Sequence, residues 1–222
     1  MYDRLRDGDT LSIRGHLSAE PDYQYKSVRF LENHDEPRAA STFENNKQKA
    51  AAIISFLTRG LRFFHQGHFE GRRKRISPHL VRGPVEELDK ELKEFYAELL
   101  KKIKRPIFRE GKWCLLNCDK SWEGNYTADS FIAFAWEGKN GEMSLVVVNY
   151  ANHPSQCYIQ LPFAQLANQP VLFEDLMSDA VYDRIGNDVI SKGMYFDMPA
   201  WGYHVFDLVV PVPLVEKKTE AP

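Results

Sequence analysis

The sequence predicts an α/β region followed by an all-β region. Strand-like and helical patterns alternate in the first half, which favours parallel strands covered by helices. Beyond residues 106–111 short strand patterns follow one another, separated by Gly and Pro, as is typical of an antiparallel β domain. We therefore expect one domain over residues 1–106 and a second over 107–210. Residues 211–222 contain three prolines and a charged end, and we expect this tail to be disordered.

The first elements are expected as loop, strand and helix. Residues Met1 to Asp22 are polar and have no sustained period, which predicts a loop or a frayed lead-in. The run from Tyr25 to Leu31 predicts a strand. A helix should start at Ser41, because Glu44 stands three residues later as in a capping box, and end before Gly60. Its buried face is expected to hold Phe43, Ala50, Ile54 and Leu57.

A second strand and a second helix complete this pattern. The apolar run Leu61 to Phe64 is typical of a buried strand. The helix is expected to begin at Pro84, a favoured first-turn residue, and to be stopped by Pro106. Its apolar stripe recurs at spacings of three and four and consists of Val85, Leu88, Leu92, Phe95, Leu99 and Ile103.

The second half is expected to consist of short strands. Asn140-Gly141 is a hairpin signal between the strand patterns 131–136 and 143–149. Further strands are expected over 156–161, 171–173 and 203–208.

Charge and composition exclude several classes of partner. The 222 residues carry 29 Lys and Arg against 31 Asp and Glu, a formal net charge of −2, so nothing favours nucleic acid or an anionic membrane. No transmembrane run or signal peptide is recognisable, and three cysteines are too few for a disulfide framework. We therefore expect a cytoplasmic protein. No Cys or His pair completes a metal site with Cys114 and Cys118, and no metal or other cofactor is predicted.

Asn33, His34 and Asp35 are the first candidate site residues, because they directly follow the first predicted strand. Polar side chains at the carboxyl end of a parallel strand point into the place where α/β folds bind ligands. The alternative for this tripeptide is a polar turn with a capping Asp. For His65 and His68, which follow the second strand, a structural role is the simpler interpretation.

Two segments resemble conserved motifs of the alpha-amylase family (glycoside hydrolase family 13). Residues 30–38, Phe-Leu-Glu-Asn-His-Asp-Glu-Pro-Arg, resemble the segment that ends strand seven of that family's barrel. Residues 60–71 resemble its strand-eight motif and keep the glycines at 60, 67 and 71. They depart from it with Arg62 in place of Pro and with His68-Phe69 in place of Gln-Glu, which puts substrate contacts from this loop in doubt.

The resemblance implies a fold and a reaction. It implies the last two βα units of a TIM (β/α)₈ barrel followed by an antiparallel β-sandwich. The reaction would be retaining hydrolysis or transglycosylation of an α-glucan or other oligosaccharide. Asp35 matches the family's transition-state-stabilising carboxylate and His34 the imidazole that hydrogen-bonds the same sugar. Asn33 would orient the turn. Arg38 would be a partner for nearby carboxylates, with a solvated loop charge as the alternative.

Two of the family's three catalytic carboxylates have no counterpart here. The nucleophile belongs to a Gly-x-Arg-x-Asp segment and the general acid to strand five, both of which would precede Tyr25; no Gly-x-Arg-x-Asp occurs. A complete barrel needs about 250 residues by itself. We therefore expect the chain to be the C-terminal part of such an enzyme and to be inactive when isolated.

Two other interpretations remain open. The chain could be a non-catalytic carbohydrate-binding or scaffolding module, with exposed aromatics such as Trp122 as its binding residues. It could also assemble with a second chain that supplies the missing barrel segment, or with itself, because two parallel strands leave unpaired edges. An upstream reading frame that encodes Gly-x-Arg-x-Asp would identify a fragment.

Overall fold

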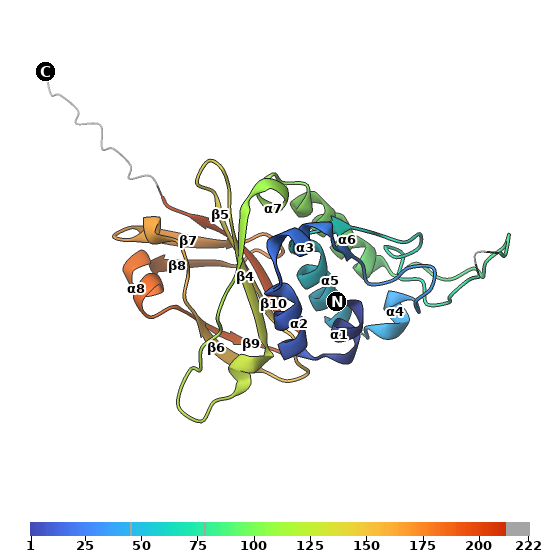
Figure 1. The fold of residues 1–222 in the computed structure, drawn as a ribbon, viewed down its shortest axis with the longest axis horizontal. Coiled ribbons are helices and arrows are strands. Elements are labelled where there is room, and N and C mark those ends of the chain that lie inside the picture. Colours follow the sequence, from blue (N-terminus) through green and yellow to red (C-terminus); the bar gives the residue numbers. More distant parts are fainter. Residues whose placement is uncertain (45, 78, 212–222) are drawn as a thin grey trace, which may run out of the picture.

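The computed structural model describes residues 1–44, 46–77 and 79–211. Most helices gather on one side of the molecule and most strands on the other (Figure 1). The mixed architecture predicted from the sequence is therefore confirmed at this level. The predicted tail lies, apart from Pro211, outside the described residues.

The chain begins with three short helices, so the predicted N-terminal loop is wrong. They are α1 (Tyr2–Asp7), α2 (Thr10–Leu17) and α3 (Pro21–Lys26). Gly8 ends α1 in a left-handed conformation, and the Asp9 carboxylate caps α2 by accepting from the Ser12 amide at 3.0 Å. None of these three helices exceeds eight residues, and α1 and α2 each bury only two apolar side chains, so neither produces a readable period.

The two predicted parallel strands are present but very short. β1 (Val28–Arg29) pairs in parallel with β2 (Leu61–Arg62), with Val28 opposite Leu61. The strand expected from Tyr25 is shorter because residues up to Lys26 belong to α3. Leu61 is 64% exposed and Phe63 38% exposed. The prediction that the second strand is buried is therefore wrong. Among the described residues no third strand pairs with β1 or β2, which leaves these side chains uncovered.

The helix between the strands is divided. α4 (Ala39–Thr42) is a single turn that ends at Phe43, and α5 (Asn46–Leu57) carries the other three of the four apolar residues expected on the buried face. All four are buried, as predicted. The expected start at Ser41 is wrong, because its hydroxyl donates to the Arg73 carbonyl instead of capping a helix.

The next helix begins later than predicted. α6 (Lys90–Ile103) is capped by Asp89, whose carboxylate accepts from the Leu92 amide at 2.9 Å. The predicted start at Pro84 is wrong, and Val85, outside the helix, is 99% exposed. The rest of the stripe, from Leu92 to Ile103, is buried as expected. The short helix α7 (Ile107–Glu110) then leads into the strands.

The second half forms a six-stranded antiparallel sheet and a two-stranded one. The large sheet has the order β3 (Lys112–Leu115), β4 (Phe131–Glu137), β5 (Met143–Asn149), β10 (Tyr203–Val209), β7 (Pro170–Asp175) and β8 (Val181–Ile185). The small sheet pairs β6 (Ser155–Ile159) with β9 (Met194–Met198). Connections include the short helices η1 (Thr127–Ser130), η2 (Ala164–Leu166) and α8 (Gly186–Ser191). β4, β5, β6, β7 and β10 match predicted strands; β3, β8 and β9 were not predicted.

Two apolar cores lie on opposite faces of the large sheet. Alternate residues of β4 point to opposite faces. Phe134 joins a core with the N-terminal helices and α5, whereas Ala133 joins a core with β6 and β9. The small sheet thus forms the second layer of the β region. The Trp136 indole donates to the Leu57 carbonyl at 2.8 Å, which ties β4 to the end of α5. Within the described ranges no helix is long and apolar enough to cross a membrane.

Candidate functional site

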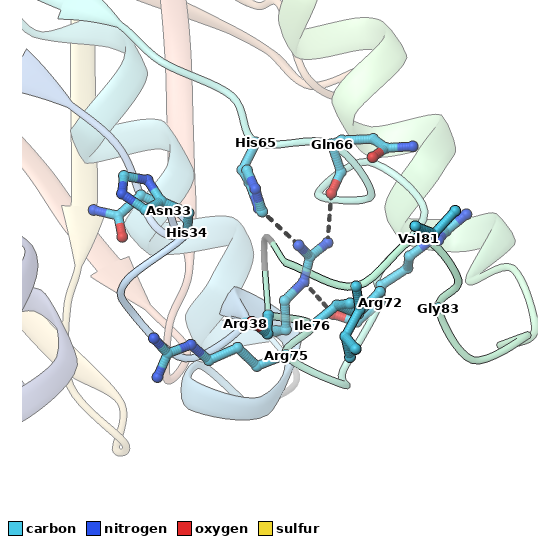
Figure 2. Close-up of a pocket in the computed structure, with 12 residues that line it drawn as sticks. Asn33, His34, Arg38, His65, Gln66, Arg72, Arg75, Ile76, Val81 and Gly83 are labelled. Atoms are coloured by element: carbon cyan, nitrogen blue, oxygen red, sulfur yellow. Dashed lines mark hydrogen bonds between the residues drawn. The ribbon is translucent and has the colours of Figure 1, made fainter.

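The segments that follow β1 and β2 meet at one pocket. Since the two strands are parallel, their carboxyl ends lie at the same edge. A cavity of about 330 Å³ opens there, and residues after both strands line it (Figure 2). The segment after β1 supplies Asn33, His34 and Arg38, and the segment after β2 supplies His65 and Gln66.

Asn33 shapes the turn that carries the candidate tripeptide. Its side-chain oxygen accepts from the backbone amides of Asp35 and Glu36, each at 2.8 Å, which closes an Asx turn. His34 Nε2 lies 3.2 Å from Asp35 Oδ2, with the two side chains 63% and 76% exposed. Asp35 does not line the pocket, so the structure gathers three of the four predicted residues there and places the fourth beside them in solvent.

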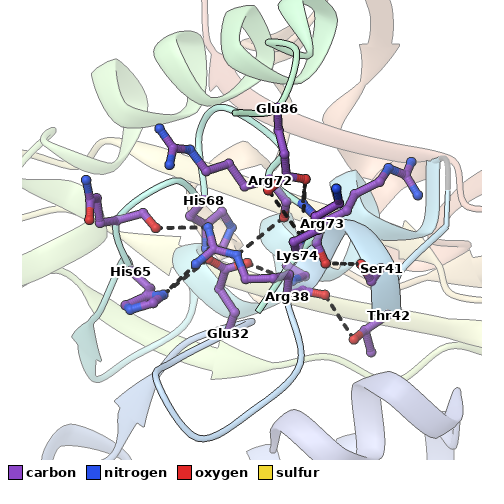
Figure 3. A network of polar contacts seen from close by, with 12 residues as sticks. Glu32, Arg38, Ser41, Thr42, His65, His68, Arg72, Arg73, Lys74 and Glu86 are labelled. Carbon is purple, nitrogen blue, oxygen red and sulfur yellow. Dashed lines mark hydrogen bonds and ion pairs between the residues drawn. The ribbon is translucent and has the colours of Figure 1, made fainter. Parts of the chain in front are cut away.

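Arg38 is buried and connects the two segments. Its guanidinium donates to His65 Nδ1 at 2.8 Å and to the Gln66 carbonyl at 2.9 Å, both in the segment after β2. It also lies 3.0 Å from Glu32 Oε1 (Figure 3). Of the two interpretations of Arg38, the structure shows the carboxylate partner and not the solvated loop charge.

Glu32, like the pocket residues Arg72 and Arg75, is a charged residue of this site that sequence reasoning missed. Its side chain is 1% exposed, and Oε2 accepts from the Ala39 amide at 2.6 Å. Burial raises the pKa of Glu32 to about 7, while the Ala39 amide and the positive charge of Arg38 act in the opposite direction. The place of Glu32 directly before the candidate tripeptide is visible in the sequence, but its burial is not, because that burial depends on contacts with Arg38 and Ala39.

The two histidines after β2 differ in surroundings. Burial and the nearby positive charge of Arg38 lower the pKa of His65. Its Nδ1 accepts from Arg38, so neutral His65 carries its proton on Nε2. His68 is buried among aromatic rings, with Nε2 2.6 Å from the Tyr96 hydroxyl. Burial lowers the pKa of His68 to about 3, which keeps this imidazole neutral.

The described residues that line the pocket include no cysteine. No group of three or more His, Cys, Asp or Glu side chains in the described part of the chain could hold a metal ion. Cys114, Cys118 and Cys157 are free thiols. The chemistry that the pocket offers is therefore hydrogen bonding and positive charge, with the Asp35 carboxylate at its edge.

Comparison with known proteins gives matches among solved structures alone. No family model and no curated protein matches the sequence. The chain is similar to a maltogenic alpha-amylase from Thermotoga neapolitana, at 17% identity and a TM-score of 0.66 over 92% of this chain and 45% of that one. An alpha-amylase from Geobacillus thermoleovorans, solved with acarbose, gives 16% identity and a TM-score of 0.65 over 91% and 43%. An alpha-amylase from Lactobacillus plantarum gives 16% identity and a TM-score of 0.63 over 90% of this chain and 41% of that one.

These matches cover nearly all of this chain but less than half of each enzyme's length. At such low identity they show the fold. The resemblance to the alpha-amylase family that the sequence motifs suggested is thus confirmed at the level of structure: the chain has the fold of a portion of an alpha-amylase-type enzyme.

Proposed function

We propose that the chain is the C-terminal part of a retaining alpha-amylase-type glycoside hydrolase or transglycosylase. In this proposal β1 and β2 are strands seven and eight of the catalytic barrel, and the antiparallel sheets form the C-terminal domain. The observation that carries it is the convergence of the segments after two adjacent parallel strands on one pocket. Barrel enzymes build their active sites at that end of their strands.

Asp35 is the proposed transition-state-stabilising carboxylate. Cleavage of a glycosidic bond passes through an oxocarbenium-like state, whose positive charge a nearby carboxylate stabilises. Asp35 is 76% exposed, so a sugar ring can contact it without displacing protein. His34, beside it, would hydrogen-bond the same ring. The nucleophile and the general acid would come from barrel segments that this chain does not contribute.

Glu32 and Arg38 are proposed as positioning residues. Arg38 joins the segment of Asn33 and His34 to that of His65 and Gln66 by short contacts, and Glu32 holds Arg38 by an ion pair. Both side chains are buried, so this frame is fixed by the fold and not by substrate. Such a frame keeps the candidate tripeptide at the carboxyl end of β1, where the reaction would occur.

The proposal is tested by acarbose binding, because acarbose is the ligand of one structurally similar alpha-amylase. Isothermal titration calorimetry of the chain should show that Asp35→Asn weakens binding at least tenfold. Asp129→Asn, which changes an exposed carboxylate of η1, is the matched control and should leave affinity unchanged. In the complete enzyme, Asp35→Asn should abolish turnover of an α-1,4-glucan without unfolding the protein. Equal affinity, or wild-type turnover, of Asp35→Asn contradicts the role.

One observation favours the non-catalytic alternative. Trp122 is 55% exposed and Tyr126 is 65% exposed on the loop before η1, and exposed aromatic faces stack on sugar rings. If this loop carries the binding, Trp122→Ala will abolish acarbose binding while Asp35→Asn leaves it intact. The same titration therefore separates the two functions.

A further inference from the structure

The pocket beside Asn33 and His34 has an unusual charge. Three arginines and two histidines line it, and neither Asp nor Glu is among the lining residues: Asn33, His34, Arg38, His65, Gln66, Arg72, Arg75, Ile76, Ser77, Leu80, Val81 and Gly83. Such a lining favours an anionic group, whereas the oxocarbenium charge of the proposed reaction would face Asp35, which does not line the pocket. The pocket therefore differs in chemistry from the neighbouring Asp35.

The positive charge of the pocket is only partly neutralised. Glu32 pairs with Arg38. Neither Arg72 nor Arg75 forms an ion pair with a carboxylate anywhere in the part of the chain that the structure describes. The nearby Glu86 accepts instead from backbone amides of the same loop, at 2.8 Å from Arg73 N. In the view of Figure 2, Arg75 extends toward the side on which Asn33 and His34 lie.

The neutral polar groups of the pocket are also arranged as donors. The Asn33 oxygen is occupied by two backbone amides, which leaves the side-chain NH₂ to donate. His65 accepts from Arg38 through Nδ1, so its Nε2–H remains to donate. A phosphate group carries only acceptor oxygens, and arginine forks match its geometry. The cavity volume of about 330 Å³ admits a small ligand.

We propose that this pocket binds the phosphate group of a phosphorylated sugar, with Arg72 and Arg75 as the principal cationic partners. The sugar part of this inference rests on the proposed function, because Asn33 and His34 line the pocket and His34 contacts Asp35. The phosphate part rests on the charge of the lining alone. The substrate of the complete enzyme would then be a phosphorylated glucoside, with its phosphate held away from the reacting bond.

The test is calorimetric titration of the chain with inorganic phosphate, glucose and glucose 6-phosphate. We expect glucose 6-phosphate to bind at least tenfold more tightly than either inorganic phosphate or glucose. A higher salt concentration should weaken the binding of both phosphate ligands and leave the binding of glucose unchanged. If glucose 6-phosphate binds no more tightly than inorganic phosphate, the pocket is a simple anion site and the proposed recognition of a sugar phosphate is wrong. If neither binds, the whole inference is wrong.

Paired variants locate the binding. Arg72→Ala with Arg75→Ala should weaken glucose 6-phosphate at least tenfold. Arg184→Ala with Lys112→Ala removes the same net charge from exposed positions on β8 and β3 and should change affinity less than twofold. Equal losses in the two double variants overturn the site. Thermal melts of all proteins identify any variant that fails to fold. Arg75→Lys keeps the positive charge and should therefore retain most of the affinity for glucose 6-phosphate. If glucose 6-phosphate binds and acarbose does not, the proposed function is contradicted but phosphate binding at this pocket is not.

Discussion

The β1–β2 pair and the β4–β5 hairpin both contain aliphatic residues but differ in how their strands are covered. Strands β4 and β5 have seven residues each and are almost entirely buried. β1 and β2 have two residues each, and Val28 and Leu61 are 46% and 64% exposed. An antiparallel hairpin finds its partner across a short turn, whereas parallel strands need neighbours from distant parts of a chain and cover on both faces. Burial of β1 and β2 therefore depends on partners more than the residues themselves suggest.

The largest expected effect comes from breaking the connection between the β4–β5 hairpin and the end of α5. Trp136→Ala should lower the free energy of unfolding by about 3–5 kcal/mol, because it empties a fully buried site and removes the bond to the Leu57 carbonyl. Guanidinium unfolding followed by circular dichroism measures it. Trp122→Ala, at a 55% exposed position, should stay within about 0.5 kcal/mol of wild type. A loss below about 1 kcal/mol for Trp136→Ala would mean that the regions do not stabilise each other through this residue.

The next effect is confined to the helical region and depends on pH. Burial lowers the pKa of His68 to about 3, against an ordinary value of 6.5. The unfolded chain therefore binds a proton that the folded protein excludes, and stability is lost as pH falls below 6.5. Between pH 7 and pH 4 this costs on the order of 3 kcal/mol.

His68→Gln tests this, because it removes the titrating group and keeps a polar side chain beside Tyr96. Urea unfolding at pH 7, 5.5 and 4 should show a shallower acid loss in the variant than in wild type. His16, whose pKa burial also lowers, to about 4, and Glu32, whose pKa is raised, titrate in both proteins and cancel in the difference. If the free energy of unfolding falls with pH equally in wild type and His68→Gln, His68 is solvated in the folded protein.

The smallest expected effect on stability concerns the exposed strands. Leu61→Lys and Val181→Lys replace side chains that are 64% and 57% exposed, and each should change the free energy of unfolding by less than about 0.5 kcal/mol. Their effects on association should differ. β2 exposes Leu61 on a short strand with one described partner, whereas the edge strand β8 exposes the charged Asp183 and Arg184 between Val181 and Ile185.

Sedimentation velocity over a concentration series measures that association. Wild type and Val181→Lys should self-associate to the same extent, and Leu61→Lys should be more nearly monomeric. A wild-type chain that is monomeric at every concentration would show that the short parallel pair needs no partner.

The sequence predicted elements whose signal is local. The Asn140-Gly141 turn and the buried runs beside it identified β4 and β5, and the stripe from Leu92 to Ile103 identified most of α6. The edge strand β8 is largely exposed and carries no such signal. β9 did carry one, since Met194, Phe196 and Met198 alternate with exposed residues.

The candidate site was predictable to the same degree. Asn33, His34 and Arg38 belong to the segment that follows the first predicted strand, and the structure brings them to one pocket. Arg72 and Arg75 come from a loop without periodicity, so only the tertiary structure places them at the same pocket. The burial of Glu32 depends on its contacts with Arg38 and Ala39, which a linear pattern does not contain.

The N-terminal helices have a consequence for how the protein is made. Leu5 and Ile13 are buried in the same core as Phe134 and Val148, and the Tyr150 hydroxyl donates to the Leu5 carbonyl across 145 residues of sequence. During synthesis these helices leave the ribosome long before the sheet that covers them exists. Contacts of such long range form slowly and leave apolar surface open in the meantime. The first residues of the chain are therefore among the last to be stabilised.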